Sequence, residues 1–169
     1  MVRKLRRIIT GHNDEGKSVV AYDGPPYGGL RLWVTDSSPA DNKHKNDAAK
    51  RKFRLEPPAN GSKFGFFQVF PEDPSKSAEE VEKEIAARFA AIDASHCRPD
   101  TSRHPRMHKT KTVDYIIFLE GEVTMLLDEG EVELKPFDVV IQRGTNHAWI
   151  NKGSKPALLA AVLIDAEPI

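Results

Sequence analysis

The sequence is poor in cysteine, and this scarcity restricts both its covalent chemistry and its expected location. Cys97 is the single cysteine among 169 residues, so no disulfide can form within the chain. A reducing compartment is the natural environment of such a chain, and we therefore expect a cytoplasmic protein. A nucleophilic Cys97 would need a base held beside it, and the sequence adjacency of His96 does not by itself establish that contact.

The sequence also lacks net charge and long apolar runs. Lys and Arg number 25 and so do Asp and Glu, which gives no electrostatic reason to expect nucleic acid or an anionic membrane as a partner. No run is long and apolar enough to span a bilayer. The basic start at residues 1–7 is not followed by an apolar stretch, so we do not expect a secretory signal. The polar segment 36–52 is interpreted as a solvated loop.

Short strands and a single helix are predicted for residues 1–104. Short extended segments separated by turn residues predict strands at 7–10 and 19–22, alternation predicts one at 30–35, and a further strand is predicted at 63–70. Aromatic residues on both faces of the last of these indicate burial on both sides, or one face packed against a partner. Ser77 and Glu80 have capping-box spacing and begin a helix at 78–92 with one apolar stripe. We expect this helix to cover the outside of a barrel without a catalytic role.

The sequence pattern of residues 105–167 is typical of an all-β unit. Strands are predicted at 115–119, 123–127, 132–134, 139–142, 148–150 and 157–164, with turn residues between them. Such closely spaced short strands are typical of a β-sandwich or barrel. We therefore expect one domain over 1–169, with extra strands, a loop and the helix in 1–104 and the barrel motifs in 105–167.

Two histidines and one aspartate form the candidate reactive centre. His108, Thr110, Thr112 and Asp114 have the same parity, so on one strand their side chains would share a face. His147 follows the tight turn 143–146 and could return alongside that strand. Two imidazoles and a carboxylate are the ligand set of a facial-triad site for a divalent metal.

These residues resemble the two motifs of the cupin superfamily. Asp114 is followed by six residues and then Gly121, which places Asp114 at the position of the family's Glu, His108 at its first His and Thr110 at its second His. The second motif begins at Asp138 and continues through Gly144, His147 and Asn151. Gln142 stands where the family has Pro, and Phe137 where it has Gly. The resemblance implies a double-stranded β-helix, also called a jelly-roll or cupin barrel.

A narrower resemblance concerns the segment 142–149, Gln-Arg-Gly-Thr-Asn-His-Ala-Trp, together with Leu163-Ile164-Asp165-Ala166. These residues are similar to those of small cupins that occur beside genes for secondary metabolites and are described as oxidoreductases. The resemblance implies a metal-dependent oxidoreductase that acts on a small aromatic or polyketide-like metabolite. Because one fold hosts many chemistries, the fold alone does not select this reaction.

The resulting hypotheses assign roles to seven residues. His108, Asp114 and His147 are expected to bind Fe, Mn, Ni or Zn, with His108 and His147 also catalytic. Alternatively, the metal site has decayed and the three residues form a polar cluster in a ligand pocket. In that case the protein is a cofactor-free isomerase or dehydratase with a histidine base, or a module that only binds a small molecule. The substrate is expected to contact Thr110, Tyr115, Gln142 and Trp149. A homodimer is expected, in which the strand 63–70 contributes to the interface.

Overall fold

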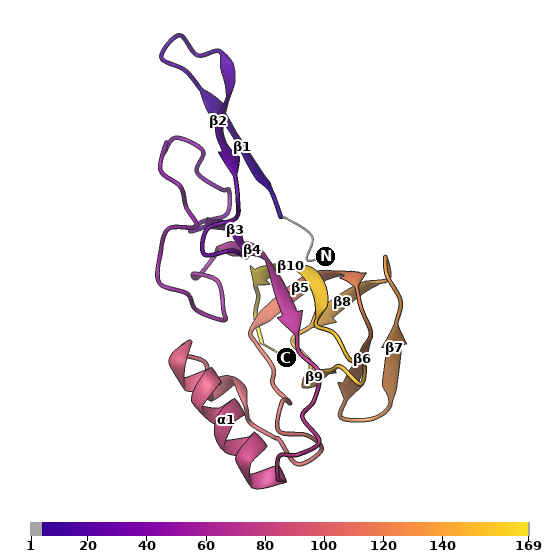
Figure 1. The fold of residues 1–169 in the computed structure, drawn as a ribbon. Helices are drawn as coiled ribbons and strands as arrows, with labels where there is room; N and C mark the ends of the chain where they lie inside the picture. Colours follow the sequence, from indigo (N-terminus) through magenta and orange to yellow (C-terminus); the bar gives the residue numbers. More distant parts are fainter. Residues whose placement is uncertain (1–4, 169) are drawn as a thin grey trace.

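The computed structural model describes residues 5–168, in which two antiparallel β-sheets face each other and curve around a shared interior (Figure 1). The larger sheet has the strand order β3-β4-β10-β5-β8, and the smaller one has the order β7-β6-β9. This is an all-β barrel with one α-helix, as the sequence predicted. The strands of the two sheets are β3 (Arg31–Thr35), β4 (Ser62–Val69), β5 (Thr112–Glu120), β6 (Val123–Leu127), β7 (Glu131–Leu134), β8 (Val139–Arg143), β9 (His147–Ile150) and β10 (Ala157–Asp165).

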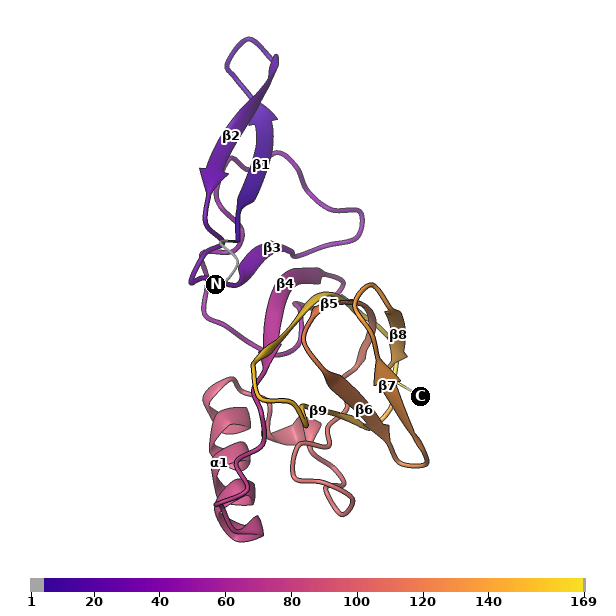
Figure 2. The ribbon, with the colours of Figure 1, turned by 45° about the vertical axis from the view of Figure 1, so that its right-hand side comes forward.

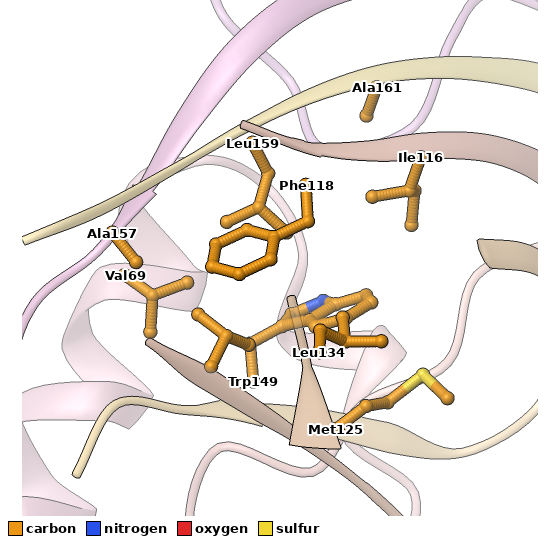
Figure 3. Packing of buried hydrophobic residues seen from close by; sticks show 10 residues of the cluster. Val69, Ile116, Phe118, Met125, Leu134, Trp149, Ala157, Leu159 and Ala161 are labelled. Atoms are coloured by element: carbon orange, nitrogen blue, oxygen red, sulfur yellow. The ribbon is translucent and has the colours of Figure 1, made fainter. Parts of the chain in front are cut away.

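The hydrophobic core fills the space between the two sheets (Figure 3). Ile116 and Phe118 of β5 project inward because residues of equal parity share a face of a strand. They pack with Leu159 of the same sheet and with Met125 and Trp149 of the smaller sheet. Each large apolar side chain buried in this way contributes about 1.5–3 kcal/mol of stability. The core holds the inner faces of β5 and β9 opposite each other, and these strands carry Asp114 and His147.

The extra strands at the N-terminus form a separate hairpin, β1 (Arg7–His12) with β2 (Ser18–Gly24), which projects away from the barrel in both ribbon views (Figures 1 and 2). Arg7 anchors its base. The guanidinium donates to both carboxylate oxygens of Asp47 at 2.9 and 2.7 Å and to the carbonyl of Leu32 at 2.9 Å. Asp47 belongs to the segment 36–52, which carries no helix or strand, as the sequence predicted.

The helix α1 (Ala78–Ala91) lies outside the two sheets (Figure 1), and its capping box is present. The Ser77 hydroxyl accepts from the backbone N–H of Glu80, and the Glu80 carboxylate accepts from the backbone N–H of Ser77. The helix also approaches the candidate site, because the Phe89 ring lies 5.1 Å from the His108 ring, centroid to centroid. The short helix η1 (Ser95–Cys97) follows. No helix within residues 5–168 is long and apolar enough to cross a membrane.

One local prediction was wrong, and the structure excludes one of two alternatives given for another segment. His108 and Thr110 do not continue the strand of Asp114, because β5 begins at Thr112 and the N–H of Lys109 donates to the carbonyl of Cys97 at 2.8 Å instead of joining the ladder. The strand predicted at 63–70 is present as β4, but of the two alternatives given for its aromatic faces, burial on both sides is not found. Phe64 is 42% exposed, since only the alternate residues of β4 face the barrel interior.

Candidate functional site

A backbone bridge brings His108 and His147 together, although 38 residues separate them in the sequence. The N–H of each residue donates to the carbonyl oxygen of the other at 2.9 Å, which forms an isolated antiparallel bridge. Directly bridged residues of an antiparallel pair place their side chains on the same face. The two imidazole rings accordingly lie with their centroids 4.4 Å apart, and both line the same cavity.

Hydrogen bonding fixes which nitrogen of each imidazole is available. Nδ1 of His108 lies 2.9 Å from the carbonyl oxygen of Arg106, and Nδ1 of His147 lies 2.9 Å from that of Thr145. Because a carbonyl only accepts, each Nδ1 must carry the proton and donate. Each Nε2 then carries the lone pair in the neutral ring. This is the arrangement in which a histidine binds a metal or accepts a proton through Nε2.

Burial keeps both imidazoles neutral. It is the main cause that lowers the pKa of His147 to about 3, and the neighbouring His108 lowers it further, while the bond to Thr145 opposes the change. Burial also lowers the pKa of His108, with the carbonyl of Arg106 opposing and Arg98 adding to the effect. At neutral pH two unprotonated rings therefore offer two Nε2 lone pairs side by side.

The cavity that contains the two rings has a volume of about 800 Å³, which is the size of a site for a small organic molecule. Its walls are largely apolar in area, although charged side chains such as Arg31 and Glu56 also line it. Besides the two histidines, its lining includes Thr110, Asp114, Lys63, Phe67, Ile116, Trp149 and Leu163. Thr110 and Trp149 thus lie where a bound substrate could reach them, as the sequence analysis proposed.

Asp114 supplies a carboxyl group to the same cavity. Its Oδ1 is buried and has no hydrogen-bond partner among the residues that the structure describes. Burial raises the pKa of Asp114 to about 6, and the Thr112 hydroxyl and Lys63 partly oppose that rise. A carboxyl group with this pKa exchanges a proton near neutral pH, so Asp114 is suited to act as an acid or a base.

Lys63 is a cavity residue that the sequence analysis missed. Strand pairing places Lys63 opposite Leu163 and Leu163 opposite Asp114, so the three residues form one row across the inner face of the sheet. The Lys63 ammonium donates to the carbonyl oxygens of Arg54 at 2.5 Å and Leu55 at 3.0 Å. Burial lowers the pKa of Lys63 to about 8. Lys63 and Phe67 have the same parity on β4, and this could have placed both side chains on the inner face. We did not predict this because a lysine at a strand end is usually solvated.

The Asp114 carboxylate lies too far from the two imidazoles to form a compact three-ligand metal site with them. Within residues 5–168, the group of three whose ligand atoms all lie within 4.8 Å of one another is Glu56, His96 and Cys97, and the set His108, Asp114 and His147 does not meet that distance. The donor chemistry of the two histidines fits a divalent metal, because both Nε2 atoms are unprotonated and both Nδ1 atoms are held. Two of the three proposed ligands, His108 and His147, are therefore suited to bind a divalent metal.

Two residues proposed to contact substrate lie elsewhere. Tyr115 is 48% exposed on the outer face of β5, because it is adjacent to the inward-facing Asp114 and strand side chains alternate. Tyr115 and Asp114 therefore face opposite sides of the sheet. Tyr115 does not line the cavity, contrary to the prediction from the sequence. Gln142 is buried, and its amide donates to the carbonyl oxygen of Thr145 at 2.9 Å and to the Thr145 hydroxyl. Gln142 thus supports the turn before His147.

The remaining motif residues position the site without entering it. Gly144 has φ of +60°, a conformation that glycine adopts readily, and a Cβ there would lie 3.1 Å from the carbonyl oxygen of Thr110. The fully buried Asn151 donates to the carbonyl oxygens of Val69 and Lys155, each at 2.8 Å. These contacts hold both ends of the segment 144–151 that carries His147 and Trp149.

Replacing Asp114 by asparagine is expected to remove a pH-dependent cost to stability. The folded protein holds the Asp114 proton up to about pH 6, whereas an unfolded aspartate releases it near pH 4. Between these values the folded state binds more protons, so stability falls as the pH rises. We expect Asp114→Asn to match the wild type near pH 4 and to exceed its free energy of unfolding by up to about 3 kcal/mol above pH 6. Urea unfolding across this range checks the difference, and parallel stability curves for the two proteins would refute it.

The fold and the histidine pair together define a small barrel protein of the cupin class. The sequence pattern of the Cupin domain family matches residues 96–164, the part that contains β5 to β9 and all but the end of β10. The chain therefore contains a cupin domain, and its relatives are cupin-domain oxidoreductases and proteins of biosynthesis clusters.

Curated relatives of the chain come from fungal biosynthesis clusters. The phomopsin biosynthesis cluster protein D of Diaporthe leptostromiformis is 43% identical over 65 residues, which cover 37% of this chain and 34% of that protein. A cupin-domain-containing oxidoreductase of Hypocrea virens is 39% identical over 67 residues, which cover 37% of this chain and 34% of that protein. The matched segment thus spans about a third of the length of these relatives. Among solved structures, a Cupin 2 conserved barrel domain protein from Salinispora arenicola aligns over 62% of this chain and 64% of that one, with 16% identity and a TM-score of 0.39.

Proposed function

We propose that this protein is an oxidoreductase whose barrel cavity binds a small, largely apolar metabolite beside His108 and His147. The observation that carries the proposal is the pair of neutral imidazoles with unprotonated Nε2 atoms, opening on a cavity of about 800 Å³. The names of the related oxidoreductases support the reaction class. The apolar lining and Trp149 fit an aromatic or polyketide-like substrate.

His108 and His147 would hold a divalent metal through Nε2. A bound redox-active ion supplies the electron transfer that an oxidation needs; because zinc has no redox chemistry, iron, manganese or nickel fits this role. Asp114 would exchange a proton with the substrate, since its buried carboxyl titrates near neutral pH. The Lys63 ammonium lies in the same inner row and would attract a negatively charged oxygen of the substrate.

The unpartnered carboxyl of Asp114 favours a second candidate, a cofactor-free isomerase or dehydratase. Asp114 does not form a compact three-ligand centre with the imidazoles, and its Oδ1 has no partner among the described residues. A neutral imidazole and a carboxyl that titrates near pH 6 can serve as base and acid on opposite sides of one substrate. Such a reaction changes the positions of protons or releases water without a change in oxidation state.

One experiment separates these candidates. The protein is loaded with Fe(II) and incubated in air with a panel of small aromatic and polyketide-like compounds, while dioxygen uptake and product mass are recorded. An oxidoreductase is expected to consume dioxygen and yield a product that has lost hydrogen or gained oxygen. An isomer or dehydrated product formed without dioxygen uptake, and unchanged by a chelator, would replace the oxidoreductase proposal with the second candidate. Tight binding of a compound without formation of any product would indicate that the protein is a binding module and not an enzyme.

We also propose that the chain forms a homodimer through the outer face of its larger sheet. Strand register aligns two rows of side chains there, and neither row contains an ionisable group other than the tyrosine. Five large members of these rows are between 42% and 62% exposed. A second copy carries the same face, so one two-fold contact would cover both apolar surfaces at once. The rows are Phe64, Val162, Tyr115 and Ile141, and Phe66, Ala160, Ile117 and Val139.

Ile117→Glu is expected to convert such a dimer into a monomer, because it would bury two carboxylates in an apolar contact. Sedimentation at micromolar concentration should give twice the chain mass for the wild type and the chain mass for the variant. Val132→Glu on β7 is the matched control, since Val132 is 46% exposed on the other sheet and the dimer should persist. A monomeric wild type would refute the interface.

A further inference from the structure

A second cluster of metal-ligating side chains lies apart from the histidine pair. Glu56 Oε2 lies 2.8 Å from His96 Nε2, and Cys97 Sγ lies 3.5 Å from the same nitrogen. His96 and Cys97 belong to η1, whereas Glu56 comes from the segment that precedes β4. From the sequence, the contact of His96 with Cys97 was left open. The structure shows that the two side chains meet and that a carboxylate from 40 residues away joins them.

We propose that Glu56, His96 and Cys97 form a zinc-binding site. A thiolate, an imidazole and a carboxylate are the three ligand types that Zn²⁺ takes in proteins. With bond lengths of about 2.0–2.3 Å, ligand atoms around a tetrahedral zinc ion lie about 3.3–3.6 Å apart. The Cys97–His96 distance already has this value. The Glu56–His96 distance is that of a hydrogen bond, and it would lengthen by about half an ångström when the ion replaces the shared proton.

The surrounding backbone holds the ligands in place. Oε1 of Glu56 accepts from the backbone N–H of Lys111 at 3.0 Å, so the other carboxylate oxygen stays directed at His96. The carbonyl oxygen of Cys97 accepts from the N–H of Lys109 at 2.8 Å, which fixes η1 against the segment leading into β5. Such outer contacts orient ligands before the ion arrives.

The site borders a second cavity, with a volume of about 320 Å³, which shares Glu56 and Thr110 with the lining of the barrel cavity. Glu56 and His96 line this cavity, and Lys109, Lys111 and Arg143 are also in its wall. Three protein ligands would leave one position of a four-coordinate zinc ion for water. The His96 side chain is 59% accessible, which gives the ion an entry path from solvent.

A nucleophilic role for Cys97 fits the structure less well than a ligand role. Burial, and to a lesser degree the Glu56 carboxylate, raise the pKa of the Cys97 thiol to about 11, while Lys111 lowers it. The free thiol is therefore protonated at neutral pH and unreactive. On zinc binding the thiol proton leaves to solvent and the sulfur becomes a ligand, a change that needs no oxidant or reductant.

Zinc at this position would connect two parts of the chain, the segment before β4 and the η1 turn, and both are hydrogen-bonded to the segment that leads into β5. Lys109 follows His108 directly, and Thr110 lines the barrel cavity. Because an ion that binds only the folded state stabilises it, zinc would stiffen the segment that positions His108. We assign the site a structural or regulatory role, distinct from the chemistry of the histidine pair.

Cobalt substitution tests this proposal on the full chain. Metal-free protein is titrated with Co²⁺ while the near-ultraviolet thiolate-to-cobalt charge-transfer band is recorded, and Zn²⁺ affinity is then measured by competition with a chromophoric chelator. The His108→Ala/His147→Ala variant is expected to keep the band and to bind one equivalent of zinc. Cys97→Ser is expected to lose the band. His96→Ala, which changes an exposed side chain and should leave the fold intact, is expected to weaken zinc binding at least about tenfold.

Three results would overturn the zinc site: no charge-transfer band in the His108→Ala/His147→Ala variant, a band that persists in Cys97→Ser, or zinc affinity unchanged in His96→Ala. Circular dichroism and thermal unfolding of each variant show that the fold is retained. Cys97→Ser and His96→Ala are each made in the His108→Ala/His147→Ala background, so the barrel histidines contribute to none of these outcomes, which are therefore independent of the proposed oxidoreductase activity.

Discussion

Replacing His147 by alanine is expected to abolish metal retention in the barrel and to slow any reaction there by roughly 10²–10⁴-fold. The reason is that His108 and His147 supply the two Nε2 lone pairs that the cavity offers side by side. The measurement is made in the His96→Ala background, so that the Glu56–His96–Cys97 cluster does not contribute. Metal content per chain is determined after incubation with Fe(II) or Mn(II) and gel filtration.

The matched control for this prediction is Tyr115→Phe, which changes an aromatic residue on the outer face of the same barrel. Its metal content and turnover should equal those of the parent. Equal metal content with and without His147 would contradict the metal role. Equal turnover would contradict a catalytic role of the histidine pair altogether.

Phe118→Ala is expected to have the largest effect on stability, with a loss of about 3–5 kcal/mol. Phe118 is completely buried and packs between the two sheets (Figure 3), so its removal leaves a cavity that the surrounding strands cannot fill. The midpoint of urea unfolding, measured with the m-value, reports this loss.

Phe137→Ala is the control for that measurement. Phe137 is 80% exposed in the turn before β8, and its truncation should change stability by less than about 0.5 kcal/mol. Similar losses for the two variants would mean that the interior between the sheets is not the core described here.

The part of the site that follows local patterns was predictable from the sequence. Alternation along β5 placed Asp114 and Ile116 on one face, and the spacing to Gly121 indicated the barrel motif. The spacing Gly144 to His147 identified a turn that presents an imidazole, and the structure shows that glycine at φ of +60°. These inferences rest on periods of two residues and on turn chemistry, which depend on near neighbours only.

The part of the site that depends on register between distant segments was not predictable. The bridge of His108 with His147 forms before the chain enters β5 at Thr112, so parity along that strand could not predict it. Lys63 enters the cavity through the pairing of β4 with β10, and Glu56 meets His96 across a loop. Such contacts depend on tertiary packing, and a one-residue change of register would reverse the face of every side chain involved.

The most direct test of the histidine centre is ¹⁵N NMR of the two imidazoles between about pH 6 and pH 7, followed by titration with Zn²⁺ in the His96→Ala background. Both rings should be neutral and protonated on Nδ1 throughout this range, and the two Nε2 resonances should shift together with one equivalent of the ion. A ring protonated on Nε2, or shifts confined to one histidine, would show that the two lone pairs do not converge on one point.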